Sequence, residues 1–518
     1  MASRMAILDG GGGVSGEGGR SGSLPASVAN LAKVAVGAGL LTVPFAFKEA
    51  GVGGALCILV GCVVLQVCSL AALSSALRRA GFSAGARGYA GLAGTLLGPK
   101  IGDCVDVVQS LCNFGAFVSF LQICGSEVGS LSTELSPYLR HEIGFEACRA
   151  IGLWALTLIV VMPLACMRTM NALRFSSALG LVCIAFVLVV VVVSFIAAGG
   201  IDATCDGLSL GDDAKHSGGG QGGNGHGIRA DGGESFDENP TIWSESVISM
   251  TRAATIIAFG FINQVQYVPI LLEMRRPTPA RTWLLIVGAT AVCFGADVLI
   301  GAFGYLTFCS ATENCILDNY DVRLGGVYLA ARASFMVSLL ITCPLVIFPV
   351  REAVVSYFTT RRKTTHAGNG VDTSTRLLST PPPPKTRIGG ATPMGPGVGE
   401  KSPLIIITTE SDVDEAGVAR NVSRRAVRLR LVTTAGIVLA GVTIASLVKR
   451  LDTVVGIVGA LGGGILMYTV PAAVALSALR GADPTNRMLS SLRSTVLVAM
   501  GGFGILLSVA GTSMQFIR

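Results

Sequence analysis

Long apolar segments recur along the chain and limit its fold more than any other feature of the sequence. A helix needs about 20 mainly apolar residues to cross the roughly 30 Å of hydrocarbon in a bilayer. Segments of this kind lie near 25–49, 53–77, 104–127, 149–167, 174–199, 245–271, 282–309, 326–350, 429–448, 453–479 and 492–516. Only 14% of the residues are charged, compared with roughly 25% in ordinary soluble domains. The sequence therefore predicts an all-α integral membrane protein with about eleven transmembrane helices.

The segments outside these spans define the expected organisation. Residues 1–23 are rich in Gly and Ser, lack the apolar core of a signal peptide, and are expected to be a disordered cytosolic tail. Residues 24–351 hold helices one to eight, with a flexible, acidic outer loop at 200–243. Residues 352–428 are rich in Pro and basic residues and are expected to be a disordered cytosolic loop. Residues 429–518 hold the last three helices.

The distribution of basic residues predicts the orientation of the chain in the membrane. Lys and Arg favour the cytoplasmic side, and most of the 39 in this chain fall on one side when the N-terminus is placed in the cytosol. An odd number of spans then places the C-terminus on the luminal or extracellular side. The net charge of +7 reflects this sidedness, so we expect the lipid bilayer as the partner and no binding of nucleic acid.

Motifs for enzymatic chemistry are missing from the sequence. All four histidines lie outside the apolar spans, and neither a Cys-x-x-Cys pair nor a phosphate-binding Gly-x-x-x-x-Gly-Lys-Ser/Thr loop occurs. We therefore expect no enzyme, metal or cofactor. Cys205, Cys309 and Cys315 fall in or near outer loops. These three are candidates for a disulfide from Cys205 to Cys309 or Cys315 in an oxidising compartment, the alternative being free thiols.

Two spans are interrupted in a way that predicts a binding site. The first span carries Gly37-Ala38-Gly39 followed by a proline, and the sixth carries Gly260, then Asn263-Gln264, then a proline. Similar breaks five spans apart are expected of two inverted repeats of five helices. Unwound backbone inside a membrane is tolerated only where protein buries it or where it lines a cavity. The alternative is that the glycines only allow close helix packing.

Half-helices at such breaks offer both polarities of backbone group. A half-helix N-terminus presents N–H groups to an anion, and a half-helix C-terminus presents carbonyl groups to a cation. An α-amino acid carries both a carboxylate and an ammonium group. The predicted ligand is therefore a small-molecule amino acid.

Several motifs together resemble one known family, the amino acid/auxin permeases. The matching stretches are Asn30 to Gly51 with Gly37-Ala38-Gly39 and Pro44-Phe45-Ala46-Phe47, Gly301 to Phe308 with Ile316 to Tyr320, Pro344 with Pro349-Val350-Arg351, and Val458-Gly459-Ala460 with Pro471-Ala472. The likeness covers nearly all of the chain outside the tail and the two long loops. It implies a LeuT-like fold of five-plus-five inverted repeats with one extra helix. It also implies symport of amino acids by alternating access, across a vacuolar or lysosomal membrane or the plasma membrane.

One departure from the family bears on the coupling ion. Lys33 stands where sodium-coupled members place an Asn that binds the ion, and Lys at this position resembles the proton-coupled branch. Its fixed ammonium could take the place of a cation against half-helix carbonyl groups. We therefore expect H⁺ rather than Na⁺ as the coupling ion, with a Lys33 side chain that extends to the cytoplasmic interface as the alternative.

A carboxylate in the seventh span is a second candidate for the coupling machinery. Asp297 lies mid-span, where a lone charge costs about 2.5–3.5 kcal/mol on insertion scales, so it should be paired, hydrated or protonated. It is a proton-site candidate. The alternative is a structural ion pair with Arg252 or Arg332.

The substrate site is expected around the two breaks. Its residues by resemblance and position are Gly37, Ala38, Gly39, Phe120, Phe259, Gly260, Phe261, Asn263 and Gln264. Phe120, Phe259 and Phe261 would give apolar walls that suit neutral amino acids, although aromatic residues in spans often only fill the core. Amide side chains at Asn263 and Gln264 can bind a substrate but cannot relay a proton near neutral pH.

Two alternatives to proton-coupled transport remain open. Sodium coupling would use carbonyl groups near residues 32–36 and the hydroxyl groups of Ser338 and Thr342 as ligands. An amino acid sensor that scarcely transports would signal through the loop 352–428. The sequence predicts no particular protein partner for either.

Overall fold

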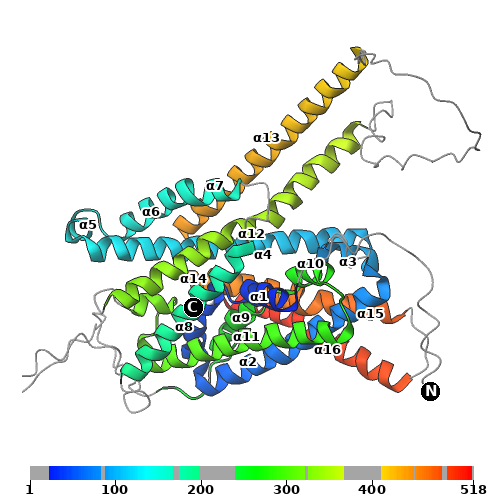
Figure 1. Cartoon of the computed structure of the whole chain (residues 1–518). Helices are drawn as coiled ribbons and strands as arrows, with labels where there is room; N and C mark the ends of the chain where they lie inside the picture. The colour runs from blue at the N-terminus through cyan, green and yellow to red at the C-terminus, as the bar shows by residue number, and fades with distance from the viewer. Residues whose placement is uncertain are drawn as a thin grey trace, which may run out of the picture. The chain divides into compact units, whose positions relative to one another are not determined.

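The computed structural model describes residues 23–82, 88–166, 174–198, 240–320, 325–366, 410–448, 450–480 and 487–515. Within these ranges the regular elements are all helices (Figure 1). They are α1 (Leu24–Ala35), α2 (Ala38–Ala80), α3 (Gly88–Leu97), α4 (Pro99–Leu135), α5 (Pro137–Glu142), α6 (Phe145–Leu156), α7 (Met162–Ala165), α8 (Arg174–Ala197), α9 (Val247–Gly260), α10 (Gln264–Glu273), α11 (Pro279–Phe308), α12 (Gly326–His366), α13 (Glu410–Leu447), α14 (Leu451–Leu461), α15 (Val470–Arg480) and α16 (Arg487–Met514). Two π-helical segments, Thr157–Val161 and Gly462–Thr469, connect α6 to α7 and α14 to α15.

Ten of the described helical stretches are long and apolar enough to cross a membrane, compared with the predicted eleven. The difference arises at the first of them, Gly39–Ala80, which has 42 residues and contains the last part of the predicted span 25–49 and all of the predicted span 53–77. At 1.5 Å per residue this stretch is about twice as long as one crossing requires. Gly51 interrupts it with φ of 75° and ψ of 162°, a backbone conformation that favours glycine.

The backbone around the kink at Gly51 is hydrogen-bonded to residues 241–244, the segment that precedes α9. Val52 N–H donates to Thr241 O at 2.9 Å, and Ser244 N–H donates to Ala50 O at 3.0 Å. A Cβ atom on Gly51 would lie 2.7 Å from the backbone of Ile242. The glycine is therefore required here both for its positive φ and for this close approach.

The chain divides into two compact units, 1–350 with 436–518 and 351–435. The second unit contains the end of α12 and the start of α13. The sequence predicts a disordered loop at 352–428 in this region. Helix α12 instead continues to His366 and α13 begins at Glu410. These extensions are rich in Ala, Arg, Glu and Val, and most of these residues allow an existing helix to continue. Residues 367–409 lie outside the described part of the chain, as do 1–22 and 200–239 of the predicted tail and outer loop.

Helices α9 and α10 and the α14–α15 stretch form the interior of the first unit. In each of these two spans 67% of the most apolar window is buried, compared with 28% in the α6–α7 and α16 spans. Helix α2 packs along both α9 and α11, and α14 packs against α4, α9 and α16. The interrupted span of α9 and α10 is therefore largely surrounded by protein, as unwound backbone in a membrane requires.

Candidate functional site

The first predicted break lies between α1 and α2. It comprises Val36 and Gly37, and we call these two residues the first break. Helix α1 ends at Ala35, where Val36 N–H still donates to Ala32 O at 2.8 Å. Gly37 then leaves the helical region, with φ of −113° and ψ of −138°, and α2 starts at Ala38. The last carbonyl groups of α1 and the first N–H groups of α2 lack partners within their own helices. Both polarities of backbone group are thus present at one point.

The second predicted break comprises residues 261–263, between α9 and α10. Phe261 N–H and Ile262 N–H close the end of α9 by donating to Ala258 O and Phe259 O. Asn263 O then accepts from Tyr267 N–H at 3.0 Å, which starts the first turn of α10. The break is therefore a short turn between two half-helices, as the sequence predicted.

The two breaks contact each other directly. A Cβ atom on Gly39 would lie 2.8 Å from Phe259 Cδ1 and 3.3 Å from the backbone of Gly260. On the other side of the first break, a Cβ atom on Gly37 would lie 3.6 Å from the ring of Phe120. The glycine-rich sequence is therefore needed because one half-helix pair packs against the backbone of the other.

A cavity of about 90 Å³ lies beside both breaks. Its lining comprises Lys33, Val34, Ala35 and Gly37 near the first break, Phe259, Ile262, Val265 and Gln266 near the second, Gln109, Cys112, Asn113, Ala116 and Phe120 from α4, Thr342, Leu345 and Val346 from α12, and Val458 and Leu466. A cavity of this size holds several water molecules. Lys33, Gly37, Phe120, Phe259 and Thr342 were predicted, so the structure brings residues of both predicted breaks to one space.

Two polar side chains of the cavity wall were missed by the sequence analysis. Gln109 Oε1 and Asn113 Nδ2 are buried and have no hydrogen-bond partner among the described residues. Buried polar atoms are nearly always bonded, so an orphaned acceptor and donor in a cavity wall suit a ligand or water. The two residues are four apart in the sequence of α4, which places them on one helix face. That spacing was the available signal.

Asn263 and Gln264 do not line the cavity but belong to a buried amide network. Gln66 Nε2 of α2 donates to Asn263 Oδ1 at 2.5 Å, and Gln264 Nε2 donates to Gln66 Oε1 at 2.5 Å. Ser69 Oγ accepts from Gln264 at 3.4 Å and donates to Met467 O in a π-helical segment. The two amides thus hold the second break against α2. Phe261 is fully buried in the core, and it too is absent from the cavity lining.

The Lys33 side chain is buried between helices, with 3% of its surface exposed. A Cβ atom on Gly180 of α8 would lie 3.0 Å from Lys33 Nζ and 3.1 Å from Ser338 Oγ of α12. Ser338 Oγ donates to Gly180 O at 3.4 Å, and Thr342 Oγ1 donates to Ser338 O at 2.7 Å. The Lys33 ammonium group therefore lies close to the hydroxyl group of Ser338. Under the sodium-coupled alternative, this hydroxyl group would be a ligand of the sodium ion.

Asp297 lies behind the second break, away from the cavity. It belongs to α11, and 2% of its surface is exposed. A Cβ atom on Gly260 would lie 3.5 Å from Asp297 Oδ2, and this oxygen has no hydrogen-bond partner among the described residues. Arg332, one of the two partners considered for it, instead pairs with Glu127 at 2.6 Å.

The remaining predicted residues have mixed outcomes. Cys309 is disulfide-bonded, Cys315 is a buried free thiol, and Cys205 lies outside the described residues. Gly39 and Gly260 form the contact between the breaks without lining the cavity, and Ala38 begins α2. Among the described residues, one group of His, Cys, Asp or Glu has the spacing of a metal site, and it lies elsewhere, at Glu127, Cys315 and Asp318.

The amide network predicts a clear difference between two asparagines. Asn263→Ala leaves the amide of Gln66 unsatisfied in the interior, which costs about 1–3 kcal/mol, and should lower the unfolding temperature of the purified protein. Asn113→Ala removes an amide whose Nδ2 already lacks a partner, so its unfolding temperature should stay near that of the native chain. Equal unfolding temperatures for the two variants would contradict the structural role of the network.

Comparisons with known proteins agree with this architecture. The family model described as transmembrane amino acid transporter protein matches residues 20–205 and 233–514. Solute carrier family 38 member 8 is 25% identical in human and 26% in mouse, over 63% of this chain and 67% of each relative. Solute carrier family 38 member 10 of rat is 25% identical over 63% of this chain and 26% of that protein. The chain therefore belongs to the transmembrane amino acid transporter family.

Proposed function

We propose that this protein is a secondary transporter that moves neutral amino acids by alternating access, without sodium and with protons as the coupling ion. The observation that carries the proposal is the contact between the two helix breaks beside a buried cavity, with the Lys33 ammonium next to Ser338. Family membership supports transport of amino acids across a membrane. The site residues support the preference for neutral substrates, the independence of sodium and the coupling to protons.

The arrangement of backbone groups suits a zwitterion. The N-terminus of α2 offers N–H groups to a carboxylate, and the carbonyl groups that end α1 suit an ammonium. Gln109 and Asn113 add to the cavity wall an acceptor and a donor that have no hydrogen-bond partner in the part of the chain that the structure describes.

The rest of the cavity wall favours a substrate without net charge. It includes the rings of Phe120 and Phe259 and aliphatic side chains, and none of the described residues that line it is acidic. A cationic side chain would therefore find no counter-charge in the wall. A neutral side chain meets mainly apolar surface.

Lys33 supports sodium-independent transport because its ammonium group would place a positive charge of the protein itself at the position where an ion would bind. A sodium ion at this position would need several oxygen ligands in place of its water. The buried Lys33 side chain approaches Ser338, and the hydroxyl group of Thr342 is already bonded within α12. An ion there would meet a like charge at short range, which is strongly unfavourable in a protein interior.

Asp297 supports proton coupling because its carboxyl group contacts the element that must move. It lies against Gly260, the last residue of α9 before the second break. Protonation would remove a buried charge at this point, and the cost of a charge inside a membrane makes such a group responsive to proton supply. We further propose that the N-terminus faces the cytosol and the C-terminus the other side, in a vacuolar, lysosomal or plasma membrane.

Replacing Gly39 tests whether the contact between the breaks is needed. Gly39→Leu would drive a side chain into Phe259 and the backbone of Gly260, and overpacking of this kind costs about 1–3 kcal/mol locally. We expect uptake into proteoliposomes to fall to background although the protein reaches the membrane. Gly295→Leu is the matched control, because a Cβ atom there meets nothing within 4 Å. Near-normal uptake by Gly39→Leu would remove this contact from the transport site.

Lys33→Asn tests the replacement of a coupling cation by a side chain. The substitution removes the ammonium and leaves an oxygen ligand beside Ser338, so sodium-free uptake should drop at least about tenfold. Added sodium should restore part of it. Uptake is measured in liposomes at fixed pH with sodium or choline. A variant that keeps full sodium-free uptake would show that the Lys33 charge has no part in transport.

Asp297→Asn tests the proton site. The amide has the size of the carboxyl group but cannot release a proton near neutral pH, so uptake should lose its dependence on an imposed proton gradient while substrate binding persists. Asp103→Asn is the control, because Asp103 is exposed near the start of α4. If the pH response of Asp297→Asn matches that of the native chain, Asp297 is a structural group.

A further inference from the structure

A buried ion pair joins two helices of the cavity wall at a level beyond the cavity. Arg332 of α12 and Glu127 of α4 are each 1% exposed, and Arg332 Nε lies 2.6 Å from Glu127 Oε2. No step of the transport proposal uses this pair. Removing two charges from water is costly unless the two groups keep a close, well-aligned contact. The presence of this ion pair between α4 and α12 therefore calls for an explanation.

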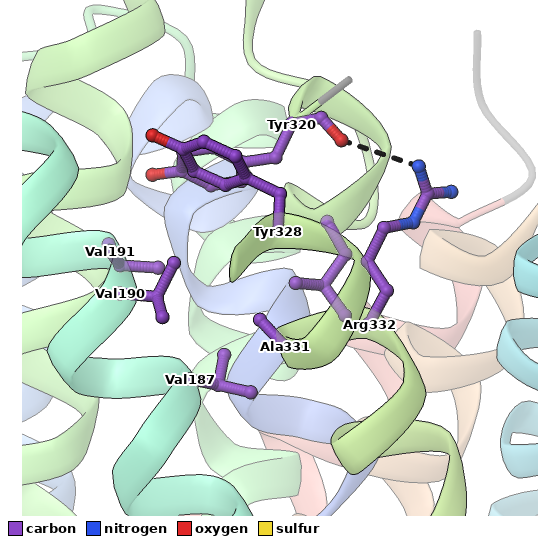
Figure 2. Close-up of a pocket in the computed structure, with 8 residues that line it drawn as sticks. Val187, Val190, Val191, Tyr320, Tyr328, Ala331 and Arg332 are labelled. Carbon is purple, nitrogen blue, oxygen red and sulfur yellow. Dashed lines mark hydrogen bonds between the residues drawn. The ribbon is translucent and has the colours of Figure 1, made fainter. Parts of the chain in front are cut away.

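The guanidinium of Arg332 also binds a third segment of the chain. Its Nη1 donates to Tyr320 O at 3.3 Å, as Figure 2 shows, and its Nη2 lies 3.9 Å from Asp318 Oδ1. Ser126 Oγ of α4 donates to the same Asp318 oxygen at 3.3 Å. One side chain therefore holds together α4, α12 and the turn at 316–320.

The position of this cluster follows from helix geometry. Glu127 is seven residues beyond Phe120 of the cavity wall on α4, which is about 10 Å along the helix. Arg332 precedes Thr342 of the cavity wall by ten residues on α12, which is about 15 Å. The two helices therefore run in opposite directions past the cavity, and the ion pair closes the space between them on one side of it.

The protein is tightly packed where the cluster meets α8. The rings of Tyr320 and Tyr328 stack with centroids 5.4 Å apart. The space that they line with Arg332 and valines of α8, shown in Figure 2, is too small for a water molecule. The packing between α8 and Arg332 thus leaves no room for water, whereas the cavity has room for a solute.

We infer that Glu127, Arg332 and Asp318 form a latch that closes the transport path on the side of the cluster and opens when the substrate site is exposed to that side. The inference rests on the proposed transport function. A buried ion pair suits such a latch because it has two favourable arrangements, paired while dry or separated while hydrated. Separation without water is strongly unfavourable, so intermediate positions of α4 and α12 are avoided.

Cys315 provides a native reporter of the latch. Its thiol is free and 3% exposed, and its Sγ lies within 4.8 Å of carboxylate oxygens of Glu127 and Asp318. Burial, followed by the Asp318 carboxylate, raises the pKa of the Cys315 thiol well above its usual value. Little reactive thiolate therefore exists while the latch is closed, and opening should expose the thiol.

The experiment measures the rate at which a maleimide labels Cys315 in the full chain in lipid nanodiscs, by mass spectrometry of the peptide. Glu127→Gln and Arg332→Gln should each raise this rate about tenfold or more, which corresponds to about 1.4 kcal/mol in the opening equilibrium. Asp318→Asn should raise it less, because Asp318 is 3.9 Å from the guanidinium and 31% exposed. Glu146→Gln is the control, since Glu146 pairs with Arg149 within one helix.

The direction of the effects separates opening from simple electrostatics. Loss of the Glu127 carboxylate lowers the pKa of Cys315, whereas loss of the Arg332 guanidinium raises it, so a purely electrostatic effect would move the two labelling rates in opposite directions. Opposite changes, or no change in either variant, would overturn the latch. If Arg332→Gln fails to fold, Arg332→Lys replaces it: Lys keeps the positive charge but not the planar fork of donors, so a raised labelling rate in that variant reports opening and not a change in the pKa of Cys315.

Labelling requires no substrate, so it is independent of whether the chain transports amino acids. Uptake by the native chain with unchanged labelling in the variants would refute the latch alone. Absence of uptake by the native chain would refute the proposed function, and with it the assignment of the latch to a transport path.

Discussion

The contact between the two helix breaks is the constraint on which the rest of the structure depends. Unwound backbone in a membrane needs protein around it, and here each break is covered by the other, with Gly39 against Phe259 and Gly260. This contact fixes the centre of the helix assembly. It also sets the residues of both breaks beside one cavity.

Most of the architecture could be predicted from the sequence because the bilayer imposes strong local rules. Apolar length located the spans, and glycine followed by proline located both breaks. The placement of Asn263 and Gln264 could not be predicted, because side-chain direction changes abruptly where a helix unwinds. Their partner Gln66 is nearly 200 positions away. The pair of Glu127 and Arg332 was missed for the same reason, since it depends on which spans become neighbours.

Buried charges in this protein are handled in three different ways. Glu127 and Arg332 neutralise each other, whereas the Lys33 side chain lies against Gly180 of α8, close to the hydroxyl group of Ser338. Asp297 lies beside a glycine at the second break, and one of its oxygens has no hydrogen-bond partner within the described ranges. Intramembrane charges are costly, so each needs a role or a partner. The ion pair matches a closed latch, Lys33 a cation fixed to the protein, and Asp297 a group that binds and releases a proton. In the proposed transport cycle, the ion pair opens and closes the path, and protonation of Asp297 couples transport to the proton gradient.

Uptake of labelled neutral amino acids into liposomes that contain the purified native chain is the most direct test of the account. Proton and sodium gradients are imposed separately, with choline in place of sodium. The account predicts uptake that follows the proton gradient and is the same in sodium and in choline. Uptake that requires sodium would contradict the assignment of Lys33 as the fixed cation of the site.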